Sequence, residues 1–239
     1  MEILLELAQD ENLQQLTSKP WIISVTGSAE EVGECYEHIL QQHGKANLNF
    51  MMEINLSCPN IVGKPPPAYD GEAMASYIKV IKRMKTATTN RIHVGIKTPP
   101  YTYSEQFKNL VSALEFGALS SGENAISFIT TTNTLGSCLI VDDLGNPALG
   151  SSNGEGIGGM AGDALHPIAL GNVKTIRRML DTSPLEHMRN IEIIGVGGVK
   201  DSAGFSRMRK VGASIVGVGT ALGREGVDIF EQILSGLAE

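Results

Sequence analysis

Short apolar runs rich in β-branched residues alternate with helix-period segments along the chain, and this alternation constrains the fold most. Six runs predict β-strands, at residues 21–25, 50–56, 92–97, 125–130, 191–196 and 214–218. Alternating strands and helices favour a parallel sheet. Because the runs are almost wholly apolar, we expect both faces of that sheet to be covered, as in a barrel or a doubly wound sheet.

The segments between the strands each carry one apolar face, as amphipathic helices do. The predicted faces are Val32, Cys35, Tyr36, Ile39 and Leu40; Met74, Tyr77, Ile78 and Ile81; Phe107, Leu110, Val111 and Leu114; Val173, Ile176 and Leu180; and Val227, Phe230 and Leu234. With no tandem repeat, low-complexity stretch or linker, residues 1–239 are expected to form a single domain.

Two stretches interrupt the alternation. Residues 59–70 contain four prolines directly after a predicted strand, so we expect a loop there, where barrels carry their chemistry. Residues 131–165 are too long for a plain connection. Within them, 139–141 and 147–149 predict a small hairpin around 142–146, and 154–162 is rich in glycine.

Composition narrows the class of ligand. Nineteen Lys and Arg against 26 Asp and Glu give a net charge of −7, which offers no basic surface for nucleic acid or anionic lipid. No apolar run reaches the ~18 residues of a membrane span, and no signal peptide precedes the first strand. The three cysteines form no C-x-x-C pattern and the five histidines show no metal spacing. We therefore expect a cytoplasmic protein with free thiols, no metal and a small-molecule substrate.

Polar residues follow several predicted strands. The segment 54–60 ends a strand in Asn55, Cys58 and Asn60, and two amides beside a thiol suit a flat ligand with ring N–H and C=O groups. The alternative is a polar turn with a buried free cysteine. Asn133 and Thr134 close the fourth strand with an amide and a hydroxyl, or form an Asx-type turn.

Cationic and glycine-rich features also lie at strand ends. Lys97 ends the third strand, where it neutralises an anionic cofactor atom or remains a surface lysine. The glycine clusters at 195–199 and 217–223 predict an anion cradle of backbone N–H groups, with tight turns as the alternative. The cluster at 156–162 matches a dinucleotide motif by letter, but no strand immediately precedes it and no acidic ribose ligand follows, so we reject that match.

Taken in order, eight motifs resemble those of the dihydroorotate dehydrogenases, and specifically the soluble class 1A branch. They lie at residues 24–27, 53–60, 63–65 with 68–70, 95–101, 133–136, 158–162, 195–199 and 218–220. Cys58 in place of serine is typical of class 1, and Thr134 replaces the usual serine while keeping the hydroxyl.

The resemblance implies a (β/α)₈ TIM barrel that binds FMN and oxidises dihydroorotate to orotate in pyrimidine biosynthesis, with fumarate as acceptor. By motif position, Cys58 would be the catalytic base, and Lys97 would lie by the flavin N1/O2 edge. The substrate ring would be held by Asn55, Asn60, Asn133 and Thr134. FMN would be bound by Asn55, Lys97, Gly162, Gly197, Gly198, Gly219 and Thr220, with the last five largely around its phosphate.

The sequence departs from this family at its start. Two βα units, roughly 60 residues, have no counterpart, so we expect an incomplete barrel of six strands whose chain, expressed alone, neither retains FMN nor turns over substrate. The resemblance also implies a homodimer, although no sequence pattern marks an interface. Alternatives are a non-catalytic remnant of the enzyme, or another flavin barrel similar to dihydropyrimidine dehydrogenase or dihydrouridine synthase.

Overall fold

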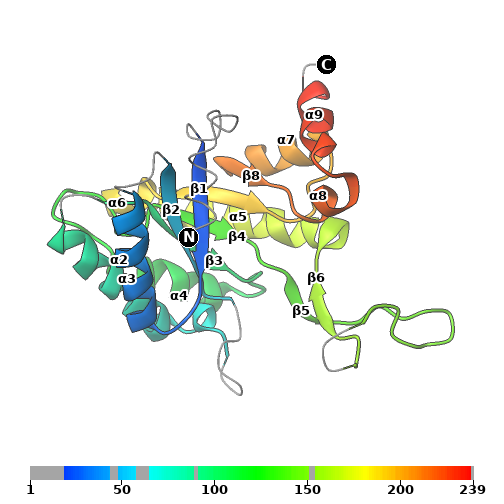
Figure 1. The fold of residues 1–239 in the computed structure, drawn as a ribbon, viewed down its shortest axis with the longest axis horizontal. Helices are drawn as coiled ribbons and strands as arrows, with labels where there is room; N and C mark the ends of the chain where they lie inside the picture. Colours follow the sequence, from blue (N-terminus) through cyan, green and yellow to red (C-terminus); the bar gives the residue numbers. More distant parts are fainter. Residues whose placement is uncertain (1–18, 44–47, 58–64, 89–90, 151–153, 238–239) are drawn as a thin grey trace. The chain divides into compact units, whose positions relative to one another are not determined.

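The computed structural model describes residues 19–43, 48–57, 65–88, 91–150 and 154–237 (Figure 1). The chain forms two compact units. The first unit comprises Met1–Thr98, Tyr103–Ile129 and Met179–Glu192, and the second unit comprises Pro99–Thr102, Thr130–Arg178 and Ile193–Glu239. The expectation of a single domain stays a prediction.

Parallel strands form the centre of the first unit. Strand β1 (Pro20–Val25) pairs with β2 (Asn49–Asn55), and β2 pairs with β3 (Val94–Thr98). Beyond β3 lies β4 (Phe128–Thr131), whose first two residues belong to this unit. In this register Asn55 is the partner of Lys97, so the carboxyl ends of β2 and β3 lie side by side.

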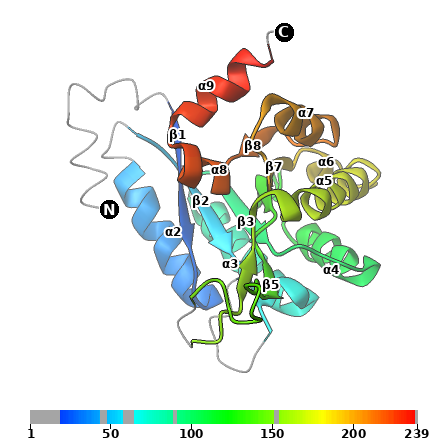
Figure 2. The same cartoon turned by 90° about the vertical axis from the view of Figure 1, so that its right-hand side faces the viewer.

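Three helices of the first unit pack in sequence against one another: α2 (Ala29–His43), α3 (Gly71–Ala87) and α4 (Ser104–Glu115) (Figure 2). The start of α3 is set locally, because the Asp70 Oδ1 atom accepts hydrogen bonds from the backbone N–H of Glu72 at 2.8 Å and of Ala73 at 3.1 Å. A short 3₁₀ turn, η2 (Pro67–Tyr69), precedes this cap within the proline-rich stretch predicted as a loop. A single further turn, α6 (Glu186–Arg189), also belongs to this unit.

The predicted apolar faces of these helices form the core of the first unit. Most of the predicted residues are buried: Val32, Tyr36, Ile39, Met74, Tyr77, Ile78, Ile81, Phe107, Leu110 and Leu114. The helical period of the sequence therefore identified the buried faces of α2, α3 and α4 correctly.

The second unit contains β7 (Glu192–Val196, from its second residue onward) and β8 (Ile215–Gly217), which are parallel with Val196 opposite Gly217. The Thr132 N–H donates to the Val196 carbonyl at 2.8 Å and so continues the ladder from the end of β4. The helices of this unit are α5 (His166–Asp181), α7 (Ser202–Lys210), α8 (Thr220–Glu225) and α9 (Asp228–Ser235). Of α5, the residues up to Arg178 belong to this unit.

All six predicted strands are present. They are hydrogen-bonded in the order β1-β2-β3-β4-β7-β8, which confirms a parallel α/β fold of six strands. The prediction that both faces of every strand are covered is wrong for β1 and β8. Each has a single strand neighbour among the described residues, and Ile22 and Ile215 are exposed.

The predicted apolar face of α9 is also wrong. Val227, Phe230 and Leu234 are exposed, Val227 at 74%, whereas Ile229 and Ile233 are buried. Both sets have helical spacing, so periodicity alone could not choose between them. The helix packs against α7 and α8, and these contacts fix which face is covered.

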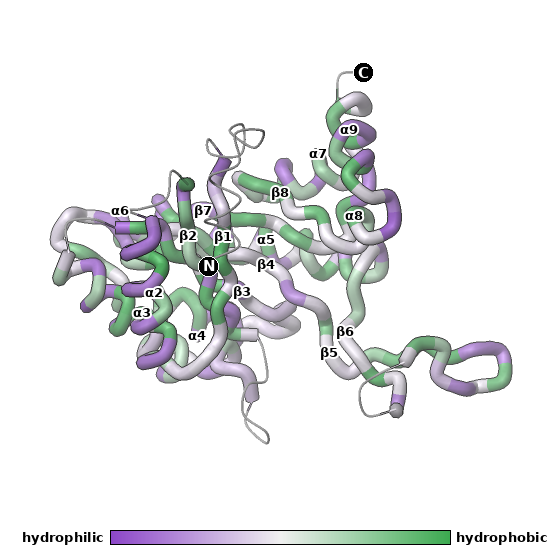
Figure 3. The backbone as a smooth tube through the Cα atoms, in the orientation of Figure 1, coloured by the Kyte–Doolittle hydropathy of each residue, from purple (hydrophilic) through white to green (hydrophobic). Residues whose placement is uncertain are grey.

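The second unit also contains a two-stranded antiparallel sheet, which follows β4 in the chain. It pairs β5 (Leu135–Cys138) with β6 (Gly158–Met160), and the chain between them forms the hairpin predicted from the sequence, with Val141 bridged to Pro147. Figure 3 shows apolar stretches along this hairpin. Its tip is ordered by the Asp142 Oδ1 atom, which accepts from the backbone N–H of Leu144 at 2.9 Å and of Asn146 at 2.8 Å.

Candidate functional site

Two of the predicted site residues lie next to each other at strand ends of the first unit. Asn55 and Lys97 are half-buried and are register partners on β2 and β3. The Asn55 Oδ1 atom accepts from the Ser57 hydroxyl at 2.7 Å and from the Ser57 N–H at 3.3 Å. The structure gives the Lys97 ammonium no partner among the described residues, so a cation and an amide stand together where β2 and β3 end.

Cys58 and Asn60 belong to residues 58–64, which lie outside the described residues. The role of Cys58 as base and that of Asn60 toward the substrate therefore stay predictions. What the structure fixes is the end of β2 at Asn55, three residues before the cysteine.

Asn133 and Thr134 follow β4 in the second unit. The Asn133 Oδ1 atom accepts from the N–H of the next residue, Thr134, at 2.9 Å, whereas an Asx turn bonds the N–H two residues on, so this bond is not the turn foreseen as the alternative. The Thr134 side chain is exposed, so its hydroxyl is accessible to a ligand.

Three hydroxyl groups immediately before Asn133 are buried and have no hydrogen-bond partner within the described part of the chain. They belong to Thr130, Thr131 and Thr132. A buried hydroxyl without a partner costs about 1–3 kcal/mol, so such groups are usually satisfied by water or a ligand. The end of β4 therefore carries three neighbouring hydroxyl groups that could hydrogen-bond to water or to a ligand.

The second unit also contains a cavity of about 120 Å³ at the carboxyl ends of β7 and β8. Four residues predicted to bind FMN line it, from three separate loops: Gly162, Gly198, Gly219 and Thr220. The fifth, Gly197, precedes Gly198 but does not line the cavity. Sequence reasoning thus selected residues that the fold brings together over a span of about 60 positions.

Backbone conformation explains why glycine occupies two of these positions. Gly162 has φ of +69° and Gly198 has φ of +67°, a region that side chains disfavour. A Cβ atom on Gly198 would also lie 2.6 Å from the Gly162 carbonyl oxygen and 2.7 Å from the His166 Cβ atom. The loops therefore approach at backbone distance, and concave loops of this kind present N–H groups to anions.

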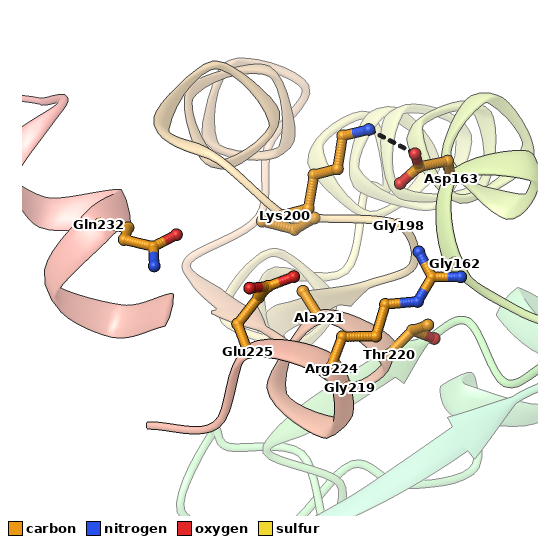
Figure 4. Close-up of a pocket in the computed structure, with 11 residues that line it drawn as sticks. Gly162, Asp163, Gly198, Lys200, Gly219, Thr220, Ala221, Arg224, Glu225 and Gln232 are labelled. Atoms are coloured by element: carbon orange, nitrogen blue, oxygen red, sulfur yellow. Dashed lines mark hydrogen bonds and ion pairs between the residues drawn. The ribbon is translucent and has the colours of Figure 1, made fainter. Parts of the chain in front are cut away.

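Charged side chains complete the cavity wall (Figure 4). The Lys200 ammonium donates to the Asp163 carboxylate, and this bond lowers the pKa of Asp163. Arg224 and Glu225 also line the cavity. The guanidinium of Arg224 makes no hydrogen bond among the described residues, although its charge, like that of Lys200, lowers the pKa of Asp163.

Three residues of this site were missed by sequence reasoning. Lys200 and Arg224 each directly follow a glycine cluster. The presence of a cation after each cluster could have predicted that both side chains belong to this site. His166 was given no role, yet it is buried and its Nδ1 lies 2.7 Å from the Gly197 carbonyl oxygen. His166 follows the 156–162 cluster by four residues, but its contact is with a carbonyl 31 residues later, which leaves no local pattern in the sequence.

Two further expectations concern motifs and metals. The cluster at 156–162 contains strand β6 (Gly158–Met160), so it is not the strand-to-helix turn of a dinucleotide site, as inferred from the sequence. Over the residues that the structure describes, no group of three His, Cys, Asp or Glu side chains could hold a metal ion. Nor does any helix there have the length and apolarity needed to cross a membrane.

The fold is that of a parallel α/β chain, with a cavity lined by glycines and charged side chains at strand ends of its second unit. The family model described as dihydroorotate dehydrogenase matches residues 2–239, which is nearly the whole chain. The chain therefore belongs to the dihydroorotate dehydrogenase family, whose members are oxidoreductases.

Curated relatives and solved structures agree with this assignment. A protein of Streptococcus equi named "Putative dihydroorotate dehydrogenase A (fumarate)" is 33% identical over all of this chain and 67% of its own length. One of the same name from Streptococcus uberis is 31% identical with the same coverage.

Two crystal structures of DHODH from Eimeria tenella match the fold. The ligand-free form has a TM-score of 0.55 at 20% identity, over 83% of this chain and 54% of its own. The form in complex with ferulenol has a TM-score of 0.62 at 17% identity, over 88% and 53%. The chain thus spans about half the length of these structures, and the match concerns the fold.

Proposed function

We propose that the protein oxidises dihydroorotate to orotate with FMN, as a step of pyrimidine biosynthesis. The observation that carries this proposal is the cavity of the second unit, where four residues assigned to FMN by motif position converge. Its volume of about 120 Å³ is well above the ~15 Å³ that one water needs.

The residues around the cavity fit a phosphate group. Backbone at Gly162 and Gly198 has the left-handed conformation of anion-binding loops, and no atom lies within 4 Å of the position that a Cβ on Gly219 would take. Lys200 is hydrogen-bonded to Asp163, so Arg224, which makes no hydrogen bond among the described residues, would be the cationic donor to the phosphate. We assign the FMN phosphate to these groups, with Gly197 and Thr220 supporting them.

Lys97 and Asn55 would contact the flavin ring and the substrate. A cation beside the flavin N1/O2 edge favours the reduced, anionic ring. Bound FMN would supply a hydride acceptor for C6 of dihydroorotate. Cys58 would accept the proton from C5, so that the C5–C6 double bond of orotate forms.

The pyrimidine would be oriented by amides and a hydroxyl, namely Asn55, Asn60, Asn133 and Thr134. These groups both donate and accept hydrogen bonds, which matches a ring of alternating N–H and C=O groups. The unpartnered hydroxyls of Thr130, Thr131 and Thr132 add polar capacity beside Asn133.

Fumarate is proposed as the electron acceptor, because the named relatives carry that acceptor in their names. The family match argues against the other flavin barrels and leaves a non-catalytic remnant as the competing reading. The cytoplasm is the proposed compartment, since Cys35 and Cys138 are free thiols.

We also propose that the protein forms a homodimer. The hairpin after β5 exposes several large apolar side chains, of which Leu144 at the ordered tip is 86% exposed. The exposed apolar residues of this segment are Leu139, Ile140, Val141, Leu144, Leu149 and Ile157. Apolar surface gathered in this way is typical of a site of protein association.

The experiment is a turnover assay of the native protein, with dihydroorotate and fumarate and with orotate formation measured by absorbance. In the native protein, as distinct from residues 1–239 expressed alone, we expect turnover with FMN present, and a loss of FMN affinity in Arg224→Met because the phosphate loses its cation. Absence of orotate formation from a protein that retains FMN would identify the non-catalytic reading as the right one.

A further inference from the structure

The Gly197–Gly198 turn is hydrogen-bonded by a histidine that does not line the cavity. Gly197 follows the last residue of β7, and its carbonyl oxygen lies 2.7 Å from His166 Nδ1. Because a carbonyl oxygen only accepts, the Nδ1–H must be the donor. His166 is 8% exposed and does not line the cavity, so it reaches a ligand there only through Gly197.

The second ring nitrogen of His166 has a partner that agrees with this arrangement. The Arg207 Nε–H donates to His166 Nε2 at 3.2 Å. A neutral ring with its proton on Nδ1 satisfies both bonds, with Nδ1 donating and Nε2 accepting. Arg207 lies on α7, the helix that the Gly197–Gly198 turn introduces. The ring thus connects the start of α5 to both the turn and the helix that follows it.

His166 also sits where the two glycine loops meet. It is the first residue of α5, directly after the 3₁₀ turn η3 (Gly162–Leu165) that begins at the cavity residue Gly162. A Cβ added to Gly198 would touch both the Gly162 carbonyl and the His166 Cβ atom. The Nδ1–H bond therefore joins the Gly162 loop to the Gly197 turn at their closest approach.

A second interaction between the same loops, an ion pair, is weaker because it is exposed to solvent. The Asp163 to Lys200 ion pair joins them at the exposed rim, with both side chains about half exposed. Exposed ion pairs contribute little, because water and salt screen them. A buried, fully satisfied hydrogen-bonded ring holds its geometry more firmly. Of the two connections, the histidine is the one suited to fix the turn.

We propose that His166 is a positioning residue for the phosphate of the cofactor: it holds the Gly197–Gly198 turn so that its backbone stays arranged for the anion. The inference rests on the proposed function for the identity of that anion, but the hydrogen bonds are testable without it. Preorganised backbone donors bind more tightly than mobile ones, because the ordering cost is already met in the free protein.

The experiment compares three variants of the native protein. His166→Leu removes both ring bonds, whereas His166→Asn keeps a donor close to the Nδ1 position. His187→Leu is the matched control, since it removes a partly buried histidine that lies 2.9 Å from Asn124 in the first unit. Affinity is measured for FMN and for riboflavin, which lacks the phosphate. Nitrogen NMR of the histidine rings reports the tautomer of His166 in the unliganded protein.

We expect His166→Leu to weaken FMN about 10- to 100-fold with riboflavin unchanged, His166→Asn to recover most of that loss, and the control to match wild type. Equal FMN affinity in His166→Leu, or an equal loss for riboflavin, would overturn the proposal. So would a ring protonated on Nε2. If wild type binds FMN no better than riboflavin, the proposed phosphate site is wrong, and the ring tautomer still decides whether His166 holds the turn.

Discussion

The two units present their candidate sites in different ways. At the strand ends of the first unit, Lys97 offers a side chain whose charged group has no partner among the described residues, beside Asn55. In the second unit, the backbone of Gly162 and Gly198 forms part of the cavity wall. The loops that carry these glycines are joined by the hydrogen bond of His166 to Gly197 and by the ion pair of Lys200 with Asp163.

This difference separates two kinds of sensitivity to mutation. A side chain that projects from a strand end is replaced with little effect on the fold, so its loss shows in the chemistry. A backbone group in a binding loop can be moved only by a substitution that changes the conformation of the loop. Such a substitution should therefore lower ligand affinity and local stability first. The predictions below test this separation, from the largest expected effect to the smallest.

Cys58→Ala is expected to have the largest effect. Removal of the base should slow flavin reduction by dihydroorotate about 10²- to 10⁴-fold while orotate affinity stays nearly unchanged, as measured by stopped-flow absorbance and by orotate titration. Because a free thiol has a pKa of ~8.5, the wild-type rate should rise with pH as the thiolate forms. Near-normal reduction in the variant would return Cys58 to a packing role.

Gly198→Ala tests the backbone site. The added methyl group meets the Gly162 carbonyl oxygen at 2.6 Å and has to adopt φ of +67°, so we expect FMN affinity to fall by at least about tenfold and unfolding to become easier by about 1–3 kcal/mol. The matched control is Gly223→Ala in α8, where no atom lies within 4 Å of the new Cβ. Equal affinities in the two variants would contradict the close approach of the loops.

Lys97→Ala should change the redox chemistry without changing the fold. Loss of the cation should lower the midpoint potential of bound flavin and slow its reduction, because the anionic reduced ring is no longer favoured. Redox titration gives the potential, and urea unfolding should give the same stability as wild type. An unchanged potential would make Lys97 a surface lysine.

Lys200→Met should have the smallest effect, since its ion pair with Asp163 is exposed at the rim. Lys200 holds the pKa of Asp163 below its ordinary value. The stability from this pair is therefore present above the unfolded pKa of ~3.9 and is lost as pH falls through the lower folded value. Urea unfolding at several pH values should show a small difference from wild type at pH 7 that vanishes in acid.

The sequence predicted much of this architecture because strand and helix periods are local properties. Six strands and the buried faces of α2, α3 and α4 follow from spacing alone. The buried face of α9 did not, because Ile229 and Phe230 both lie on helically spaced apolar rows, and only packing against α7 and α8 selects one of them.

The candidate site shows the same limit. Gly198 and Gly219 were predicted from their glycine clusters as parts of an anion cradle, whereas Gly162 was assigned by the family resemblance alone, and all three line one cavity. His166 was not readable, because its role depends on where a histidine at the start of α5 meets a carbonyl after β7, 31 residues later in the chain. Contacts of this kind arise from tertiary structure and leave no local pattern.

The most direct test of the account is the absorbance spectrum of the purified native protein under anaerobic conditions. For the native protein, as distinct from residues 1–239 expressed alone, the account predicts bound FMN that loses its yellow absorbance when dihydroorotate is added and regains it when fumarate follows. A protein without flavin, or one whose flavin stays oxidised with dihydroorotate, would contradict the proposed function.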